Sequence, residues 1–389
     1  MNYTDMRKPL KHFRKHLRTA FTSAHTKRLV PTLWEKSEEM IKLIEDELQE
    51  DPDRIINLRD YGRRIMWDSF GLMVLGHDFE TLSKPQSDIR TRFTQMQPET
   101  RAFDYGSIIL SFVDLRPVLK LLSPILRRST LKQASNYIRE FAQRLVENKQ
   151  DKIQAEGFSE AQDLDILSIA VGSKAFEQDD LVDHMMLFFT AGPNSTSVAL
   201  DWAIYELSGR PKLQQSLREE IRECVRGADT KATTEIGSQL QTLPLLNAFI
   251  SEVLRYYPFI PLSTKVAEVD TSILGEPVTK GTVVMVPVEA FNRNKSLWGP
   301  DAESFNPDRW LGDASGGAST NYAMMTFGAG PMACIGQNFA RAMLACFVAA
   351  LVLRFDIDVV NRQTAGKPKP GQFKHSAEGM RARLKIMNR

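Results

Sequence analysis

The sequence predicts a mainly α-helical protein with small β-sheets late in the chain, and two observations lead to this fold class. From residue 1 to about residue 260, apolar side chains recur at helical spacing. After Pro258 this spacing gives way to short runs with β-branched residues and turn signals. Hydrophobic residues make up 42% and charged residues 25% of the chain, the balance of a soluble globular protein.

Helical periodicity is clearest in residues 29–49, 130–153 and 213–225. Residues 185–211 form another long apolar segment, which small and polar residues interrupt at its centre. A last helix is expected at residues 338–355. It contains the longest apolar run of the chain, which is too short to cross a bilayer and is therefore expected to be buried.

Small strands are expected in the runs TSILG, EPVT and GTVVMVPV, between residues 271 and 288. A stretch rich in Gly, Pro and Asn follows, near residues 291–335. The length of 389 residues would by itself favour two or three domains. Because no linker or repeat divides the chain, we expect a single domain over residues 1–389.

Composition excludes several classes of protein. A net charge of +2 argues against a nucleic-acid-binding protein. Three scattered cysteines are too few for a disulfide framework and favour a reducing compartment. No signal peptide or transmembrane anchor is evident in this chain. Residues 105–129 alternate aliphatic with basic residues, which fits an interfacial membrane helix and a pair of core helices equally well.

The first candidate functional residues surround a single cysteine. In FGAGPMACIGQNFARA, Cys334 is bracketed by an aromatic residue and three glycines: Phe327, Gly328, Gly330 and Gly336. Glycines permit positive φ and close backbone approach, as a loop pressed against a flat cofactor needs. Backbone N–H groups and the following helix N-terminus would favour a thiolate. Taken alone, the segment fits a buried cysteine in a glycine-rich turn at least as well.

A second segment, FISEVLRYYP, places Glu252 and Arg255 one helical turn apart on one face of a helix. Such a pair is usually a solvated surface pair. Here its neighbours are apolar, so the pair could be buried, and a buried pair needs further partners. Arg309, in FNPDRW, would supply one and would leave a glutamate between two arginines.

The polar centre of residues 185–211 is the third segment. In AGPNST, Asn194, Ser195 and Thr196 follow two small residues, which would open a groove in the helix. Hydroxyl groups there can accept or relay protons. The alternative is that Asn194 and Ser195 only satisfy carbonyls that Pro193 leaves without helical donors.

Taken together and in this order, these segments resemble the signature motifs of the cytochrome P450 family, the haem-thiolate monooxygenases, in their eukaryotic microsomal form. The match covers nearly the whole chain. The resemblance implies the P450 fold and a haem b cofactor whose iron takes Cys334 as its axial ligand. A thiolate ligand pushes electron density toward iron and favours O–O cleavage.

The resemblance also assigns roles to the other residues. The cysteine loop resembles F-x-x-G-x-R-x-C-x-G, so Phe327 and the three glycines are expected to lie against the haem. Arg14, in FRKHLRTAFT, and Lys265, in PLSTKVAEVD, stand where the family has propionate-binding residues. The lock beneath the haem would consist of Glu252, Arg255 and Arg309. The oxygen-activation segment would consist of Asn194, Ser195 and Thr196.

Several positions depart from the family pattern. Met332 replaces the usual arginine before the cysteine, and Leu10 replaces a Trp or His. Asn194 replaces an acid and cannot ionise, so a carboxylate-driven proton relay is not expected there. Ser195 and Thr196 retain hydroxyls that can donate hydrogen bonds. The chain is also expected to lack the anchor, the A and B helices and much of the first sheet.

The leading hypothesis is a monooxygenase that inserts one atom of O2 into a small hydrophobic substrate of secondary metabolism. Electrons would come from a separate NADPH–cytochrome P450 reductase, because no flavin-binding segment is evident. Alternatives are a haem-thiolate isomerase, dehydratase or oxidative coupling enzyme, or an inactive shortened chain. The expected location is the cytoplasm or the cytosolic face of the endoplasmic reticulum, with possible peripheral membrane contact. A metal hydrolase is not expected, because His12 and His16 lack the Glu of H-E-x-x-H.

Overall fold

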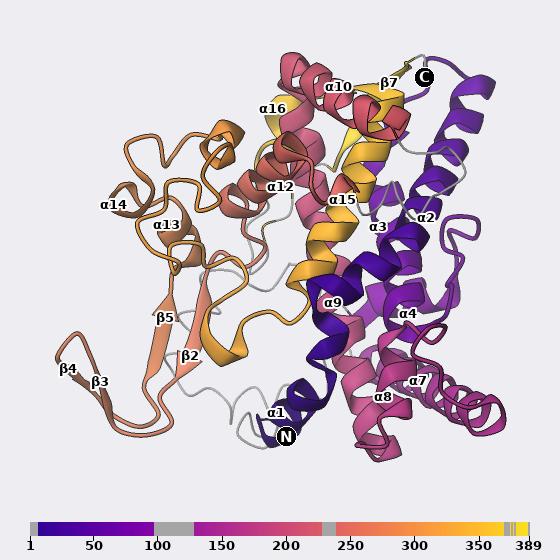
Figure 1. Cartoon of the computed structure of the whole chain (residues 1–389), viewed down its shortest axis with the longest axis vertical. Coiled ribbons are helices and arrows are strands. Elements are labelled where there is room, and N and C mark those ends of the chain that lie inside the picture. The colour runs from indigo at the N-terminus through magenta and orange to yellow at the C-terminus, as the bar shows by residue number, and fades with distance from the viewer. Residues whose placement is uncertain are drawn as a thin grey trace.

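The computed structural model describes residues 7–96, 128–227, 239–368, 374, 376 and 379–387. Two long helices, α9 (Gln178–Ser208) and α15 (Gln337–Arg354), pack against each other in the middle of the molecule (Figure 1). The other helices surround this pair, and most of the small strands lie to one side. The expected mainly α-helical architecture with small sheets is confirmed.

The helices of the first half follow the predicted periodicity. They are α1 (Arg7–Leu17), α2 (Ser23–Glu50), α3 (Leu58–Phe70), α4 (Asp88–Met96), α7 (Arg128–Glu156) and α8 (Ile166–Gly172), with a short π-helix at Gly71–Leu75. The predicted segments 29–49 and 130–153 lie within α2 and α7. Side-chain caps fix three of the starts, because Thr22, Asn57 and Asp165 each accept a backbone N–H three residues further on.

Two further helices follow α9. They are α10 (Pro211–Gly227), which contains the predicted segment 213–225, and α12 (Pro244–Tyr256). Proline begins both helices, where its missing N–H has no helical partner to lose. Both helices pack on α9 and α15.

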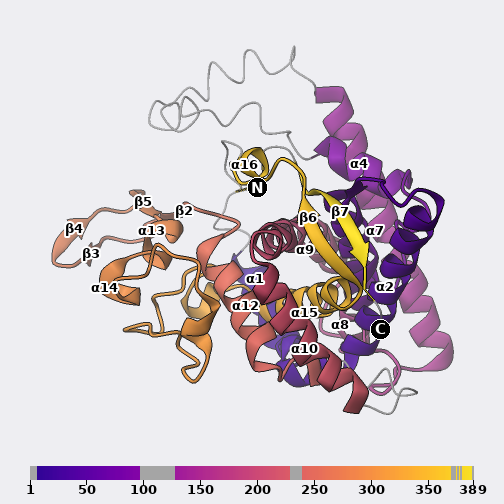
Figure 2. The same cartoon turned by 90° about the horizontal axis from the view of Figure 1, so that it is seen from above.

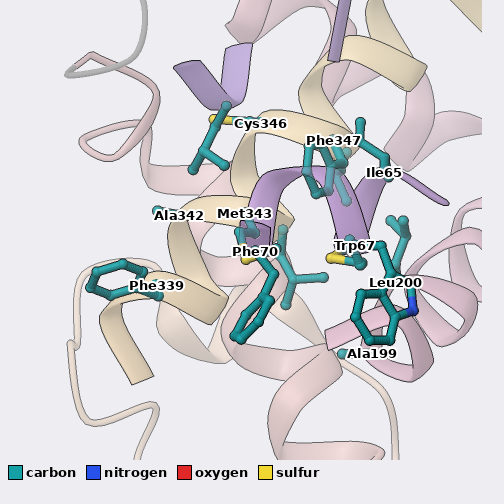
Figure 3. Close-up of a cluster of buried hydrophobic side chains, with 14 of the residues drawn as sticks. Ile65, Trp67, Phe70, Ala199, Leu200, Phe339, Ala342, Met343, Cys346 and Phe347 are labelled. Atoms are coloured by element: carbon teal, nitrogen blue, oxygen red, sulfur yellow. The ribbon is translucent and has the colours of Figure 1, made fainter. Parts of the chain in front are cut away.

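A hydrophobic core joins α3, α9 and α15 (Figure 3). Side chains of all three helices meet in the part of it that the figure labels: Ile65, Trp67 and Phe70; Ala199 and Leu200; and Phe339, Ala342, Met343, Cys346 and Phe347. The predicted last helix is therefore buried, as expected. Within the described residues α15 is the one helix apolar and long enough to span a membrane, and 67% of it is buried inside the molecule.

The predicted strands form two antiparallel ribbons. One pairs β2 (Ser263–Val266) with β5 (Val283–Val286), and the other pairs β3 (Thr271–Ile273) with β4 (Glu276–Val278). Figure 2 shows these strands projecting to one side, together with α13 (Val288–Asn292) and α14 (Lys295–Trp298). Short 3₁₀ turns at Pro307–Trp310 and Gly330–Met332 lie in the Gly/Pro/Asn-rich stretch.

A third sheet was not among the predicted strands, and one of its strands, β1, lies in the otherwise helical part before residue 260. The strand β1 (Ile56–Asn57) pairs with β7 (Arg381–Ile386), which also pairs with β6 (Phe355–Val359). The alternation of buried and outward-facing side chains in β6 and β7 is the period-2 signal that could have predicted them. Two residues of β1 are too few to show such a period. The sheet joins the end of the chain to α3, and α16 (Arg362–Ala365) lies between its last two strands in sequence.

The segment with the ambiguous membrane signal lies almost wholly outside the described residues, which resume at Arg128. Its two interpretations, an interfacial helix and a pair of core helices, therefore both stay predictions.

Candidate functional site

The Glu252–Arg255 pair lies at the C-terminal end of α12, and neither side chain is exposed to solvent (0% each). The contact is bidentate. Arg255 Nε donates to Glu252 Oε2 and Arg255 Nη2 donates to Oε1, each over 2.7 Å. The alternative of a solvated surface pair is therefore wrong.

Glu252 has the further partners that a buried carboxylate requires. Arg309 Nε approaches Oε1 at 3.4 Å, and the backbone N–H of Asn306 donates to the same oxygen over 2.7 Å. Trp310 Nε1 donates to Oε2 over 3.0 Å. Arg309 has a second anion, since its Nη2 lies 2.7 Å from Asp301 Oδ2. The expected glutamate between two arginines is thus present.

Arg255 uses its remaining donors on backbone carbonyls. They belong to Asn292 and Ala302, each at 2.7 Å, and to Ser304 at 2.9 Å. The arginine therefore ties α12 to α13 and to the loop at residues 299–306. The sequence analysis did not predict the contacts of Trp310, Asn306 and Asp301. Asn306 and Trp310 belong to the same FNPDRW motif as Arg309, and Asp301 lies just before it, so their closeness in sequence to Arg309 could have indicated them.

The cysteine loop closes on itself before α15 begins. The Cys334 N–H donates to the carbonyl of Phe327 over 2.7 Å, and Gly328 N–H donates to Met325 over 2.9 Å. Gly328 and Gly330 have φ values of +69° and +74°, a backbone conformation that favours glycine. Gly336 does not adopt it, because its φ is −84°. The expected positive φ is therefore present at two of the three glycines, Gly328 and Gly330.

The Cys334 side chain is crowded by protein but reaches solvent. Burial raises the pKa of its thiol, while the Gly336 N–H and the charge of Arg14 lower it, and burial prevails. The expected N–H group is present and favours the thiolate, while desolvation of the thiol acts in the opposite direction.

Arg14 reaches the cysteine loop from α1. Its Nη1 donates to the carbonyl of Pro331 over 3.0 Å and its Nη2 to that of Ala333 over 2.7 Å. The guanidinium thus spans Met332, the position where the family pattern has a second arginine. Lys265 lies exposed on β2, and within the described ranges no contact joins it to the loop.

The AGPNST segment lies within α9, which is continuous through Pro193. In the middle of this mostly buried helix one stripe is solvent-exposed, at Leu187, Thr190 and Ala191, and it continues to Asn194, which is half-buried. Gly192 does not open a groove as expected. An added Cβ there would lie 2.4 Å from the ring of Phe70, so α3 fills that space.

The two hydroxyl groups of the segment differ in their hydrogen bonds. Ser195 Oγ donates to the carbonyls of Ala191 at 2.9 Å and Gly192 at 3.3 Å. Thr196 is buried, and within the described residues neither its hydroxyl nor the Asn194 amide has a hydrogen-bond partner. The carbonyl that Pro193 deprives of its donor is that of Phe189, which Ser195 does not contact. The alternative in which Ser195 repairs the helix at that carbonyl is therefore not supported.

The loop fits a flat prosthetic group that takes one ligand from the protein. Its single thiol is accessible, and a Cβ added at Gly330 would meet nothing within 4 Å. At Gly328 the nearest atom would be 3.9 Å away. Within the described residues no group of three or more His, Cys, Asp or Glu side chains could hold a metal ion by itself. His12 and His16 are exposed on α1.

Comparison with known proteins decides the family. The cytochrome P450 family model matches residues 4–379. The chain belongs to the cytochrome P450 family. This P450 is 36% identical to the cytochrome P450 monooxygenase FSL4 of Gibberella zeae, over 96% of this chain and 70% of that protein. It is also 36% identical to sphH of Aspergillus fumigatus, over 89% of this chain and 65% of that protein.

A third relative of this P450 is FUM15 of Gibberella moniliformis, at 31% identity over 89% of this chain and 66% of that one. All three carry the name cytochrome P450 monooxygenase and come from filamentous fungi. The chain spans about two thirds of the length of the relatives it matches.

Proposed function

We propose that this P450 is a monooxygenase that inserts one oxygen atom from O2 into a small hydrophobic substrate of fungal secondary metabolism. Electrons would come from NADPH through a separate reductase. The observation that carries the proposal is the solvent-accessible Cys334, held on a glycine loop at the start of a buried helix. The names of the relatives support the same reaction class.

The cofactor would be haem b, with Cys334 as the axial ligand of its iron. Phe327, Gly328, Gly330 and Gly336 would lie against the ring, where the glycine backbone leaves room. Arg14 and Lys265 would face the propionates. When bound, haem with a thiolate ligand supplies the electron density that favours O–O cleavage. Glu252, Arg255 and Arg309 would hold the chain beneath it.

The exposed stripe on α9 would face the substrate, and Asn194, Ser195 and Thr196 would serve proton delivery. Asn194 can donate or accept a hydrogen bond but cannot exchange a proton by ionising. The Ser195 proton is engaged with helix carbonyls, so it has to leave them before Ser195 can donate elsewhere. Proton delivery in this protein is therefore expected to be slow.

This engaged hydroxyl favours a second candidate, a haem-thiolate isomerase, dehydratase or oxidative coupling enzyme. Isomerisation and dehydration are redox-neutral and need no proton delivery to oxygen, whereas oxidative coupling still uses O2 as the oxidant but places none of its oxygen in the product. For the cellular location we propose the cytosolic face of the endoplasmic reticulum or the cytoplasm, with peripheral membrane contact at most.

The test starts with the carbon monoxide difference spectrum of the reduced protein, recorded for the parent chain, Cys334→Ala and Cys224→Ser. The thiolate spectrum is expected in the parent and Cys224→Ser, and its loss in Cys334→Ala. A thiolate spectrum in Cys334→Ala would reject the ligand assignment. Its absence in the parent would favour the inactive-chain hypothesis.

Oxygen labelling then separates the two enzyme classes. With reductase, NADPH and ¹⁸O2, a monooxygenase places one labelled atom in its product. An isomerase, dehydratase or coupling enzyme leaves the product unlabelled.

A further inference from the structure

Two stacked aromatic side chains lie where α9 and α12 pack together, on segments other than the cysteine loop. Trp202 of α9 and Tyr257, the residue after α12, have ring centroids 4.3 Å apart and an interplanar angle of 3°. Neither ring is open to solvent, since Trp202 is 0% and Tyr257 is 8% exposed. Indole and phenol rings lose an electron more readily than most other side chains, so the pair is a candidate for electron transfer.

The phenol of Tyr257 has a base in direct contact. Its hydroxyl donates a hydrogen bond to Glu206 Oε1, and the other oxygen of this buried carboxylate forms an ion pair with Arg210. An ionised carboxylate only accepts hydrogen bonds, so the phenol has to be the donor. Burial raises the pKa of the Tyr257 phenol, so its proton stays on the oxygen at neutral pH as long as the ring keeps all its electrons.

Trp202 has no such base. Its indole N–H donates to the backbone carbonyl of Lys374 over 2.8 Å. A carbonyl oxygen accepts a hydrogen bond but is too weak a base to take the proton. An oxidised Trp202 would therefore keep a buried positive charge, which is costly. Oxidation of Tyr257 creates no such charge if its proton leaves with the electron, so the radical is expected to settle on Tyr257.

We propose that Tyr257, together with Trp202 and Glu206, is a redox site that gives one electron to a one-electron oxidant. As the electron leaves, the O–H bond of Tyr257 breaks and an O–H bond forms on Glu206. Tyr257 becomes a neutral phenoxyl radical, Glu206 becomes a neutral carboxylic acid, and the oxidant is reduced by one electron. A one-electron reductant reverses the step and returns the proton to Tyr257.

Half-buried tyrosines connect the stacked pair to the surface. Tyr256 contacts Tyr257 with ring centroids 4.9 Å apart, and Tyr205 contacts Trp202 with centroids 5.7 Å apart. An electron can therefore pass from the buried pair to an oxidant in solution through rings in contact. The proposal does not depend on the proposed function, because an external oxidant can be used in place of one generated during turnover.

The test uses photogenerated tris(bipyridine)ruthenium(III) as the oxidant and electron paramagnetic resonance of samples frozen at increasing delays after the flash. The full chain is compared with Tyr257→Phe, which keeps the ring but has no O–H bond, and with Glu206→Gln, which keeps an acceptor but not a base. Tyr322→Phe is the matched control at a tyrosine that is 66% exposed. Radicals on exposed tyrosines couple with one another and decay, whereas the buried Tyr257 ring is shielded from such encounters.

A long-lived tyrosyl radical is expected in the parent and in Tyr322→Phe, and its loss in Tyr257→Phe. In Glu206→Gln the long-lived radical is expected to form ~10²–10⁴-fold more slowly, which is the usual contribution of a positioned proton acceptor to rate. A long-lived radical of parent size in Tyr257→Phe, equal rates in the parent and Glu206→Gln, or no long-lived radical in the parent overturns the proposal. Urea unfolding midpoints check that each variant is folded, and Glu206→Gln provides the reading if Tyr257→Phe is not.

Discussion

Glu252 illustrates how one buried carboxylate organises a region of the molecule. It accepts hydrogen bonds or ion pairs from two arginines, one indole and one backbone N–H, which come from α12 and from the Asn306–Trp310 segment. A charge removed from water is tolerated only when every oxygen is occupied in this way. The residue therefore connects two parts of the chain that are more than fifty positions apart.

We expect Glu252→Ala to destabilise the protein by roughly 3–5 kcal/mol, because Arg255 and Arg309 would face each other without their shared anion. Insoluble or haem-free protein is the expected result. Urea unfolding and haem content measure it. Glu303→Ala is the control, since this exposed carboxylate pairs with Lys295 at the surface and with no other side chain among the described residues. Full haem content and an unchanged midpoint in Glu252→Ala would contradict the structural role.

Asn194 and Ser195 are expected to limit how efficiently NADPH is coupled to product. Positioned proton transfer typically contributes ~10²–10⁴-fold to rate. Asn194→Asp should raise the product formed per NADPH, unless burial keeps the aspartic acid neutral. Ser195→Ala should lower it and release more peroxide. The measurement is the amount of product, NADPH consumed and peroxide released by the parent, Asn194→Asp and Ser195→Ala. If the product formed per NADPH is equal in all three, an enzyme that needs no oxygen activation is favoured.

At the scale of elements, α9 is held by its neighbours rather than by its own sequence. Pro193 removes one helical N–H donor in the middle of the helix. The helix nevertheless continues to Ser208, because α3, α7, α12 and α15 all pack on it. Gly192 lets the ring of Phe70 approach the helix backbone, so a small residue serves packing where the sequence pattern predicted a groove.

Gly192→Ala tests this packing. An alanine normally stabilises a helix by up to about 1 kcal/mol over glycine. Here its Cβ would overlap the Phe70 ring, and we expect a net loss of roughly 1–3 kcal/mol of stability. Thermal or urea unfolding measures the change, and Ala191→Ser on the exposed stripe is the control. The double variant with Phe70→Leu should recover much of the loss. A stabilised Gly192→Ala protein would show that the contact is not tight.

At the scale of the whole molecule, the lowered pKa values of three histidines indicate how the stability of the fold depends on pH. Burial lowers the pKa of His25, His77 and His184. His184 stacks on Phe13 of α1, with ring centroids 4.0 Å apart. Above the pKa of histidine in the unfolded chain, about 6.5, all three side chains are neutral in both the folded and the unfolded state and do not reduce the stability of the fold. As the pH falls from there toward the lower folded values, the unfolded chain binds more protons, so the folded state loses stability.

We therefore expect the urea midpoint to decrease as the pH is lowered from about 7.5 to about 5. His184→Gln should reduce the slope, because one of the three groups no longer titrates. His16→Gln on the exposed face of α1 is the matched control. If the urea midpoint of His184→Gln changes with pH as steeply as that of the parent, His184 does not contribute to the pH dependence of stability.

Sequence reasoning predicted the long helices well, because an amphipathic period over many residues is a strong local signal. It also brought Glu252, Arg255 and Arg309 together, since a charged pair among apolar neighbours demands a partner. It missed β1 because two residues carry no period. The haem-binding, catalytic and structural roles of the candidate site residues, and the extent of the single domain, stay predictions.

By itself the sequence determined the mainly α-helical class, the four motifs in their order and the family resemblance that the comparison with known proteins confirmed. These depend on spacing along the chain. The tertiary structure alone decided that burial of Cys334 acts against the N–H group that lowers its pKa, and that Phe70 fills the space at Gly192. Each of these is set by what distant segments bring to within a few ångströms, and neither desolvation nor contact between such segments can be computed from residue spacing.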